Sequence, residues 1–232
     1  MVDFVMTRKG VDKIALVSHS DDWGKSNRDP AVEHLKAAYK LGPVVDLSME
    51  RGSSDATPQI LKLKESGAQV VLAMLYPAEL AIFMRDAYKY GLKIPVLGNQ
   101  GVSLEDTRNR AGSPAAVDDL YVFFPLAAPY NDPPMAKWAS LVTKHFPNEK
   151  LDTFTFLGMG GTLAVIEALK KAGPDLTQDK FIAALNTIRN FDTGVLSAPI
   201  SFTPEDHAGV KGGQMLTYVK GKPTIMPKWV DK

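Results

Sequence analysis

Short apolar runs alternate with longer amphipathic segments through the first half of the chain. The apolar runs predict strands, because they are short and are bounded by turn-forming residues, while the segments between them repeat apolar residues at helical spacing. Strands that alternate with helices of this length indicate an α/β fold with an open, largely parallel, Rossmann-like sheet. Predicted strands cover residues 13–19, 43–49, 68–76, 94–99 and 120–125, and predicted helices cover residues 29–42, 57–67 and 77–91.

Capping residues mark the ends of these predicted helices. Asp29 is placed to cap the first helix with Pro30 at its first position, and Thr57 is placed to cap the second, which Gly67 would end. The third helix carries apolar residues at helical spacing and is therefore expected to bury one face, formed by Leu80, Phe83, Met84, Ala87 and Tyr88.

The pattern changes after a proline-rich stretch, PLAAPYNDPP at 125–134. Three helices are predicted in succession, and the glycines of LGMGG in the middle one would permit close packing against a neighbour. No strand separates these helices, so apolar side chains such as Trp138 and Phe181 lack an obvious sheet to cover. The predicted helices cover 134–146, 153–172 and 177–190, and they are followed by strands at 198–202 and at 214–226, the latter with a turn at Gly221.

Composition and charge exclude several classes of function. The chain has 232 residues, enough for one large domain or two small ones, and its 27 basic and 26 acidic side chains leave a net charge of +1. That balance gives no electrostatic basis for binding nucleic acid or an anionic membrane surface. No apolar run is long enough to cross a bilayer, and the start, MVDFVMTRKG, lacks the pattern of a signal peptide. The absence of cysteine excludes thiol catalysis, disulfides and thiolate metal sites.

The first predicted strand runs into SHSDDWG, residues 18–24, where several kinds of site are conceivable. A Rossmann cofactor site would need more glycines than Gly24 alone. Asp21 and Asp22 suit either a cation or phosphoryl site or a solvated loop, and His19 has no partner at a useful spacing, which favours a structural role. Trp23, at the carboxyl end of a strand, is either a ligand contact or part of loop packing. The other histidines form no metal-ligand pattern and stand at positions 34, 145 and 207.

A second candidate region ends the strand in KIPVLGNQG, residues 93–101. The flanking glycines allow the backbone to turn, which leaves the amides of Asn99 and Gln100 facing a possible ligand. Because parallel strands end at the same edge of a sheet, Trp23, Tyr76 and Gln100 are expected there together. Two aromatic side chains and an amide suit the binding of a small molecule, and no general acid–base pair accompanies them. This combination predicts binding without chemical conversion.

Four segments resemble the branched-chain amino acid (leucine/isoleucine/valine-type) substrate-binding proteins of ABC transporters, which are type I periplasmic binding proteins. The segments are VSHSDDWGKS, SSDATPQILKLKESGAQVVLAMLYPAELAIFMRDAYKYGLKIPVLGNQG, FTFLGMGGTLAVIEALKKAG and FDTGVLSAPISFTPEDHAG. The most specific stretch is AYKYGLKIPVLGNQG, at the end of the second segment. The resemblance implies two Rossmann-like lobes that close on a ligand, a membrane permease as partner, and a periplasmic location.

The resemblance also implies roles for individual residues. Trp23 and Tyr76 fall where the family has aromatic residues against the ligand, and Gln100 falls where amino-acid-binding members carry an acid that grips the ligand's ammonium group. Because an uncharged amide cannot neutralise a buried ammonium, a carboxylate without an amine fits this chain better than a standard amino acid. The predicted ligand-binding residues are therefore Trp23, Tyr76, Gln100, Asn99 and Asp22, with no metal and no cofactor.

In the family's terms, residues 1–126 with 213–232 are expected to form one complete lobe. Residues 127–212 would then be an incomplete, mainly helical part of the other lobe, whose first part is missing. Exposed helix faces in that part predict a homodimer. Two alternatives to a binding protein for a small organic acid are a truncated relative acting as a signalling or scaffold module, and an enzyme that uses Asp21, Asp22 and His19.

Overall fold

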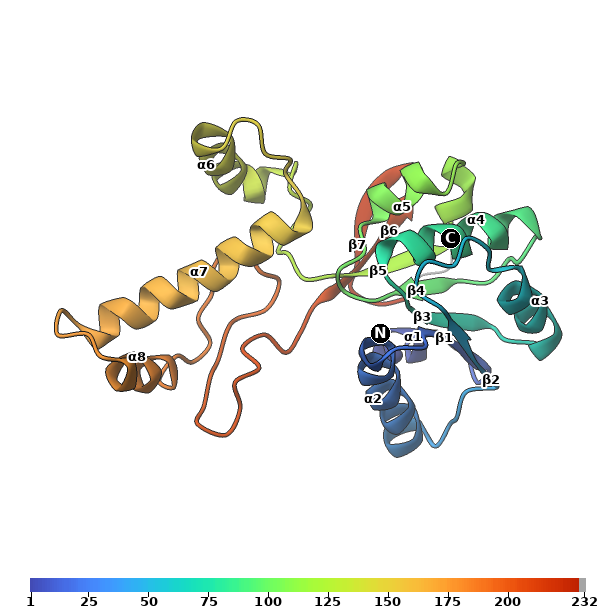
Figure 1. Cartoon of the computed structure of the whole chain (residues 1–232), viewed down its shortest axis with the longest axis horizontal. Helices are drawn as coiled ribbons and strands as arrows, with labels where there is room; N and C mark the ends of the chain where they lie inside the picture. The colour runs from blue at the N-terminus through green and yellow to red at the C-terminus, as the bar shows by residue number, and fades with distance from the viewer. Residues whose placement is uncertain (230–232) are drawn as a thin grey trace. The chain divides into compact units, whose positions relative to one another are not determined.

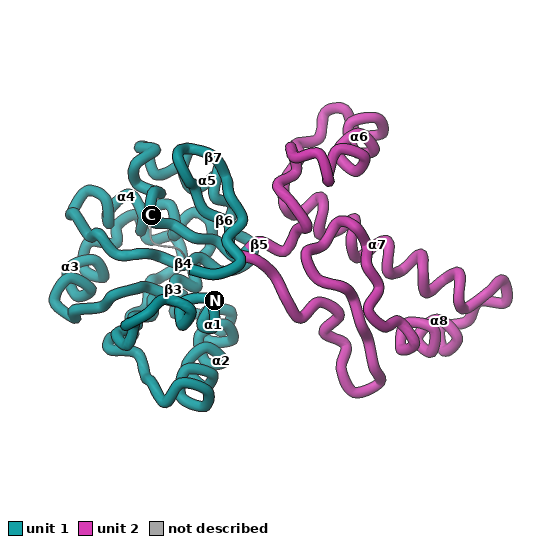
Figure 2. The backbone as a smooth tube through the Cα atoms, turned by 180° about the vertical axis from the view of Figure 1, so that it is seen from behind, with its two compact units in different colours: residues 1–123, 215–232 teal, residues 124–214 magenta. Residues whose placement is uncertain are grey.

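A computed structural model describes residues 1–229 and divides the chain into two compact units (Figure 2). Unit 1 comprises residues 1–123 with the chain's last segment from residue 215, and unit 2 comprises residues 124–214. The sequence placed this division at residues 126 and 213. Whether the units correspond to one complete and one incomplete lobe of a larger binding protein stays a prediction.

Unit 1 is built on a sheet whose strands follow the order β2-β1-β3-β4-β5-β6-β7. The first five strands run parallel, and β6 and β7 form an antiparallel hairpin at one edge. The predicted α/β class with an open, largely parallel sheet is confirmed. The strands are β1 (Ile14–His19), β2 (Val45–Met49), β3 (Val70–Met74), β4 (Val96–Gly98), β5 (Leu120–Phe124), β6 (Gln214–Val219) and β7 (Lys222–Met226).

Helices cover both faces of this sheet (Figure 1). The first two helices pack together on one face, and the next three pack together on the other. The core between these layers is apolar, because both faces of the central strands β1 and β3 are buried throughout. The helices are α1 (Val2–Met6), α2 (Asp22–Tyr39), α3 (Thr57–Ser66), α4 (Pro77–Lys89) and α5 (Leu104–Arg110).

The helix that follows β1 begins earlier than the sequence predicted. Asp21, not Asp29, caps it, because the Asp21 Oδ1 atom accepts a hydrogen bond of 2.8 Å from the Gly24 N–H. Pro30 therefore lies inside α2 rather than at its first position. Within SHSDDWG, β1 ends at His19 and α2 begins at Asp22, so that only Ser20 and Asp21 connect them and Trp23 belongs to the first helical turn.

The caps and faces of α3 and α4 also differ from the prediction. Ala56, not Thr57, is the N-cap of α3, and its N–H donates to Oδ2 of the buried Asp86 in α4 at 2.8 Å. Burial alone would raise the pKa of the Asp86 carboxyl, but hydrogen bonds from Arg85 and Ala56 outweigh burial and hold that pKa below its usual range. Asp86 is thus part of the buried side of α4, whereas Tyr88, which was expected there, is 54% exposed.

Two short helices, α1 and α5, were not predicted. Ser103 caps α5 by accepting a hydrogen bond from the Asp106 N–H at 3.2 Å. The five residues of α1 are too few to show a helical period in the sequence, and their buried members Val2 and Val5 belong to the core of unit 1.

Unit 2 is mainly helical, as expected. Its helices are α6 (Ala136–His145), α7 (Thr153–Ala172) and α8 (Gln178–Leu185), of which α7 and α8 pack on each other. The strand predicted at 198–202 is wrong: in this segment only Ile200 pairs, through single bridges to Phe191 and Val210. The predicted close approach in LGMGG occurs at Gly160, where an added Cβ would lie 2.7 Å from the Cγ atom of Leu196.

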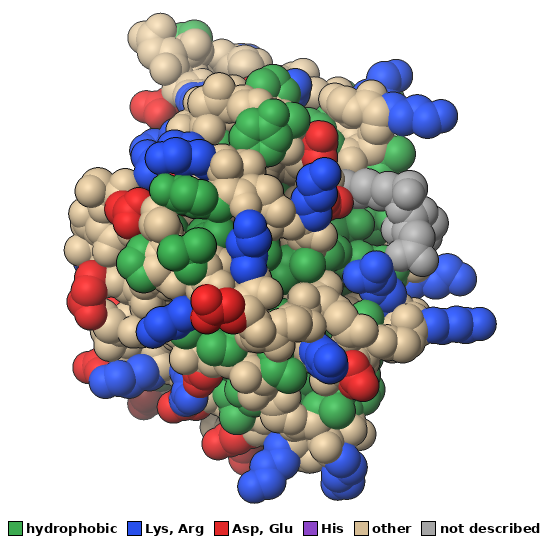
Figure 3. Space-filling view, turned by 90° about the vertical axis from the view of Figure 1, so that its right-hand side faces the viewer, with side chains coloured by type: hydrophobic (Ala, Val, Ile, Leu, Met, Phe, Trp, Pro, Cys, Tyr) green, Lys and Arg blue, Asp and Glu red, His purple; other side chains and the backbone are tan. Residues whose placement is uncertain are grey.

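The charged side chains are mixed on the face of the molecule that Figure 3 shows. Within residues 1–229, no helix combines the length and the apolar character that crossing a membrane requires.

Candidate functional site

The site is positioned by the place where the strand order of unit 1 reverses. β1 pairs in parallel with β2 on one side and with β3 on the other, so that Ser18 lies beside both Ser48 and Met74. The chain leaves β1 and β3 toward opposite faces of the sheet, into α2 and α4 (Figure 1). In open α/β sheets, the crevice outside the carboxyl ends of strands at such a point is where ligands bind.

Trp23 and Tyr76 meet at this point. Their rings stack with centroids 4.2 Å apart and planes inclined by 20°. Trp23 comes from the first turn of α2, and Tyr76 is the N-cap residue of α4, so each ring is fixed by a helix start. The sequence predicted this shared edge, and the structure adds that the two rings contact each other directly.

Polar groups surround the aromatic pair. The Tyr76 hydroxyl donates to Oδ2 of Asp21 at 3.4 Å, and the guanidinium of Arg51 lies 5.0 Å from the centroid of the Tyr76 ring. Burial raises the pKa of the Tyr76 phenol, and the neighbouring Asp21 carboxylate raises it further. Tyr76 therefore stays protonated at neutral pH, and the exposed Arg51 is the cation available beside the ring.

His19 is buried next to the pair, and the structural role expected for it stays a prediction. Its ring lies 4.5 Å from that of Tyr76 and 6.1 Å from that of Trp23. Its Nε2 atom is 3.5 Å from Oε2 of the buried Glu79, which is close enough for an ion pair but lacks hydrogen-bond geometry. Among the described residues, neither ring nitrogen of His19 has a hydrogen-bond partner.

Glu79 connects the site to the loop after β2. Its Oε1 atom accepts a hydrogen bond of 2.7 Å from the N–H of Gly52, the neighbour of Arg51. Sequence reasoning missed Glu79 and Arg51. Arg51 could have been found from the order of the strands, because β2 lies beside β1 and ends at the same edge of the sheet. That strand order was not predicted.

Gly24 permits the tight turn from β1 into α2. A Cβ atom at this position would overlap the carbonyl oxygen of His19. Only glycine allows the first turn of the helix to approach the end of the strand this closely. The glycine of SHSDDWG thus serves backbone packing at the aromatic pair.

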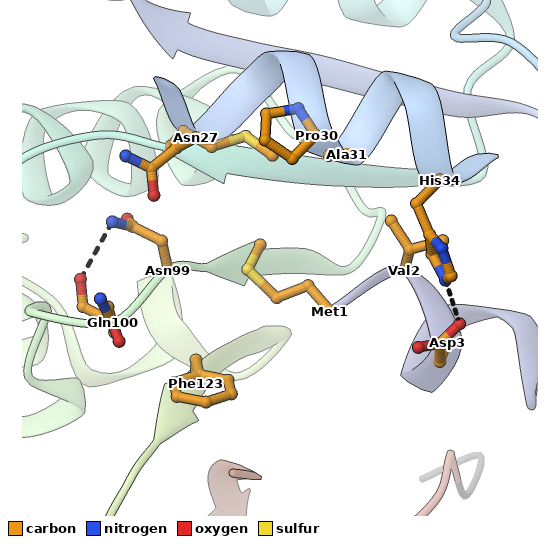
Figure 4. A pocket seen from close by; sticks show the side chains of 11 residues that line it. Met1, Val2, Asp3, Asn27, Pro30, Ala31, His34, Asn99, Gln100 and Phe123 are labelled. Atoms are coloured by element: carbon orange, nitrogen blue, oxygen red, sulfur yellow. Dashed lines mark hydrogen bonds and ion pairs between the residues drawn. The ribbon is translucent and has the colours of Figure 1, made fainter. Parts of the chain in front are cut away.

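Asn99 and Gln100 end β4 on the same edge. Gly101, with a φ of +93°, turns the chain away from the strand. Asn99 is buried and its Nδ2 atom donates to the Gln100 carbonyl oxygen at 2.9 Å, whereas the Gln100 side chain is exposed. Both residues line a pocket of about 320 Å³ between the end of β4 and the α1–α2 layer (Figure 4). Neither Trp23 nor Tyr76 lines that pocket, so the structure separates the predicted residues into two groups.

Asp22 belongs to neither group. Its side chain is fully exposed and pairs with Lys25 at 3.4 Å along the outer face of α2. In the described part of the chain, no three histidine or acidic side chains gather closely enough to hold a metal ion.

Comparison with known proteins identifies the family. Residues 1–223 match the family described as "Periplasmic binding protein". The Leu/Ile/Val-binding protein homolog 3 of Brucella melitensis is 27% identical over 214 residues, which cover 86% of this chain and 55% of that protein. The chain thus spans about half the length of this relative.

Solved structures of similar fold are named for different ligands. A fatty acid ABC transporter substrate-binding protein from Thermomonospora curvata superposes with a TM-score of 0.76 at 26% identity, over 95% of this chain and 58% of that one. A branched-chain amino acid ABC transporter protein from Thermus thermophilus with bound valine has a TM-score of 0.80 at 21% identity, over 98% and 63%.

The resemblance drawn from the sequence segments is confirmed by these matches. The family match covers almost all of the chain, and the fold of the similar structures agrees with the α/β architecture of unit 1. The family is one of binding proteins and not of enzymes, as the sequence indicated. The chain belongs to the periplasmic binding protein family.

Proposed function

We propose that this chain binds a small organic acid at the Trp23–Tyr76 pair, without converting it, as part of the substrate-binding component of an ABC importer. The stacked aromatic pair at the reversal of strand order carries the proposal. Aromatic faces offer apolar contact area at a low cost in side-chain entropy, and the carboxyl edge of the sheet is the expected place for a ligand. A permease partner and a periplasmic location follow from the same proposal.

The polar groups beside the pair favour a carboxylate ligand. Arg51 can supply a positive charge and paired N–H donors to a carboxylate. Both oxygens of the Asp21 carboxylate already accept hydrogen bonds within the protein, one from the Gly24 N–H and one from the Tyr76 hydroxyl. Gln100, at the place where amino-acid-binding relatives are expected to carry an acid, cannot neutralise an ammonium group.

The ligands named for similar proteins include organic acids with an amine and organic acids without one. One similar structure holds valine and another is named as a fatty acid binding protein, so the fold accepts an acid with or without an amine. The two aromatic rings and the neutral Gln100 support the second kind for this chain, an acid whose remainder is apolar or aromatic.

Calorimetric titration with paired ligands tests the proposal. Leucine and phenylalanine are compared with their deaminated analogues, isocaproate and hydrocinnamate. Each acid is expected to bind at least about tenfold tighter than its amino acid, because the neutral Gln100 cannot neutralise the ammonium. Tighter binding of the amino acids would contradict the ligand class. Absence of binding throughout, combined with no small molecule retained in native mass spectrometry, would favour the signalling or scaffold alternative.

A further inference from the structure

We propose that Glu79 is a positioning residue: it holds the turn after β2 so that Arg51 stays beside the Tyr76 ring, and through Arg51 it makes the site select a carboxylate over a neutral group. The inference rests on the function proposed for the Trp23–Tyr76 pair and deepens it. Glu79 is only 5% exposed, so it acts through Arg51 and not by touching the ligand.

The turn after β2 comprises residues 50–53, with Arg51 and Gly52 as its two central residues. The Ser53 N–H donates to the Glu50 carbonyl oxygen at 3.2 Å and closes the turn. Gly52 has a φ of +80°, which the third residue of a type II turn requires and which glycine adopts readily. Because the closing hydrogen bond uses the Ser53 N–H, the Gly52 N–H is left for a partner outside the turn.

Glu79 is that partner. It stands at the third position of α4, where a glutamate ordinarily reaches back to the N–H of its own N-cap residue. Here its Oε1 atom instead accepts from the Gly52 N–H at 2.7 Å, and its Oε2 atom lies 3.5 Å from Nε2 of His19. The side chain therefore serves the contact between α4 and the turn, and not the cap of its own helix.

Two contacts join the start of α4 to this turn. The Arg51 guanidinium lies 5.0 Å from the centroid of the Tyr76 ring, and the next residue, Gly52, bonds to Glu79. Tyr76 and Glu79 belong to the same first turn of a helix, so fixing Gly52 against Glu79 also fixes the Arg51 backbone relative to the Tyr76 ring. Arg51 is exposed, and without this anchor its long side chain would sample many positions away from the ring.

The rest of the loop has other attachments, which makes the effect of Glu79 local. The Ser20 hydroxyl donates to Oε2 of Glu50 at 2.7 Å, and the Ala56 N–H donates to Oδ2 of Asp86 at 2.8 Å. Asp86 provides a matched control, because it is also a buried acid of α4 that accepts from an N–H of this loop. It holds the end of the loop at the start of α3, whereas Glu79 holds the part that carries Arg51.

The test measures a carboxylate preference, defined as the ratio of the affinities for hydrocinnamate and for its neutral amide, 3-phenylpropanamide, in calorimetric titrations of the whole chain. Glu79→Asp keeps the acid but is one methylene too short to reach the Gly52 N–H, and we expect the preference to fall about tenfold because Arg51 no longer meets the carboxylate. Glu79→Gln keeps the length and an accepting oxygen, so it should retain the preference. Arg51→Gln should lose it, and adding Glu79→Asp to Arg51→Gln should cause no further loss.

A ligand-free measurement and the matched control separate positioning from general stability. Hydrogen exchange of the Gly52 amide should be about tenfold faster in Glu79→Asp and unchanged in Glu79→Gln, because only the first loses the hydrogen bond. Asp86→Ala should lower the melting temperature but keep both the preference and the Gly52 exchange rate. Should Glu79→Asp not fold, Glu79→Met takes its place, since it keeps the length and lacks the accepting oxygen.

Several results would overturn the positioning role. An unchanged preference in Glu79→Asp would do so, as would an equal loss in Glu79→Gln or Asp86→Ala, because charge or stability would then explain the effect. If neither probe binds the unmodified protein, the function proposed for the aromatic pair fails. Gly52 exchange then decides on Glu79 alone: faster exchange in Glu79→Asp supports its hold on the turn, and unchanged exchange refutes it.

Discussion

Replacing Trp23 by alanine separates a ligand-contacting aromatic from a core aromatic. Trp23 is half-buried, and its main contact is the stack with Tyr76 at 4.2 Å. An aromatic stack contributes about 0.5–1.5 kcal/mol beyond the burial of area, so we expect Trp23→Ala to lower the free energy of unfolding by about 1–2 kcal/mol. In a chain of this size that corresponds to a fall in melting temperature of roughly 2–8 °C.

Phe83 supplies the comparison within the same unit. It is completely buried in α4, and Phe83→Ala is expected to cost about 3–5 kcal/mol because it removes buried area and leaves a cavity. The ligand affinity of the Phe83→Ala variant, measured below its melting transition, should remain near that of the unmodified protein, since Phe83 lies away from the carboxyl edge of the sheet. Trp23→Ala should do the opposite and weaken the binding of hydrocinnamate by about tenfold or more.

The assay is a thermal melt of each variant beside a calorimetric titration with hydrocinnamate. Tyr76→Ala should follow Trp23→Ala, and Trp23→Phe should recover most of the affinity because it keeps an aromatic face. The reasoning fails if Trp23→Ala keeps full affinity and loses as much stability as Phe83→Ala, because the ring would then be a core residue.

Further predictions concern charge, packing, pH and assembly. Gln100→Glu should shift preference toward ligands that bear an amine, because a carboxylate pairs with an ammonium, and identical affinities across leucine, phenylalanine and their deaminated analogues would exclude Gln100 as a ligand contact. Gly160→Ala should lower the free energy of unfolding by about 1–3 kcal/mol because the added methyl group clashes with Leu196, whereas Gly161→Ala, with open space around it, should be neutral or stabilising. Equal effects of the two changes in chemical denaturation would refute this packing. Asp86→Asn should lower the melting temperature at neutral pH. Because folding lowers the pKa of Asp86, the difference in melting temperature from the unmodified protein should shrink as pH falls below about 4. A difference that is constant with pH would contradict a stabilising role for the ionised Asp86. The exposed apolar side chains of α6, α7 and α8, among them Leu141, Phe154, Ile166 and Ile182, lead us to expect a homodimer that buries these faces, and a 25 kDa species at every concentration in light scattering would end that idea.

Most of the longer helices and strands, the parallel sheet and the family could be predicted from the residues alone. These follow from local signals: the apolar period separates strands from helices, and the alternation of the two implies parallel strands that end at one edge. That edge is why Trp23 and Tyr76 were expected together although they are far apart in the chain. To infer that two residues share an edge of the sheet, it is enough to know that each one follows a strand and that the strands are parallel.

The contacts that make the site specific could be seen only in the folded chain. Asp21 replaced Asp29 as a helix cap because its side chain reaches the Gly24 N–H, and Gly24 is required because the helix start touches the end of β1. The placing of Glu79 against His19, and of Arg51 above Tyr76, depends on the order and register of strands that are distant in sequence. Such contacts depend on distances between side chains, and periodicity along a chain carries no information about those distances.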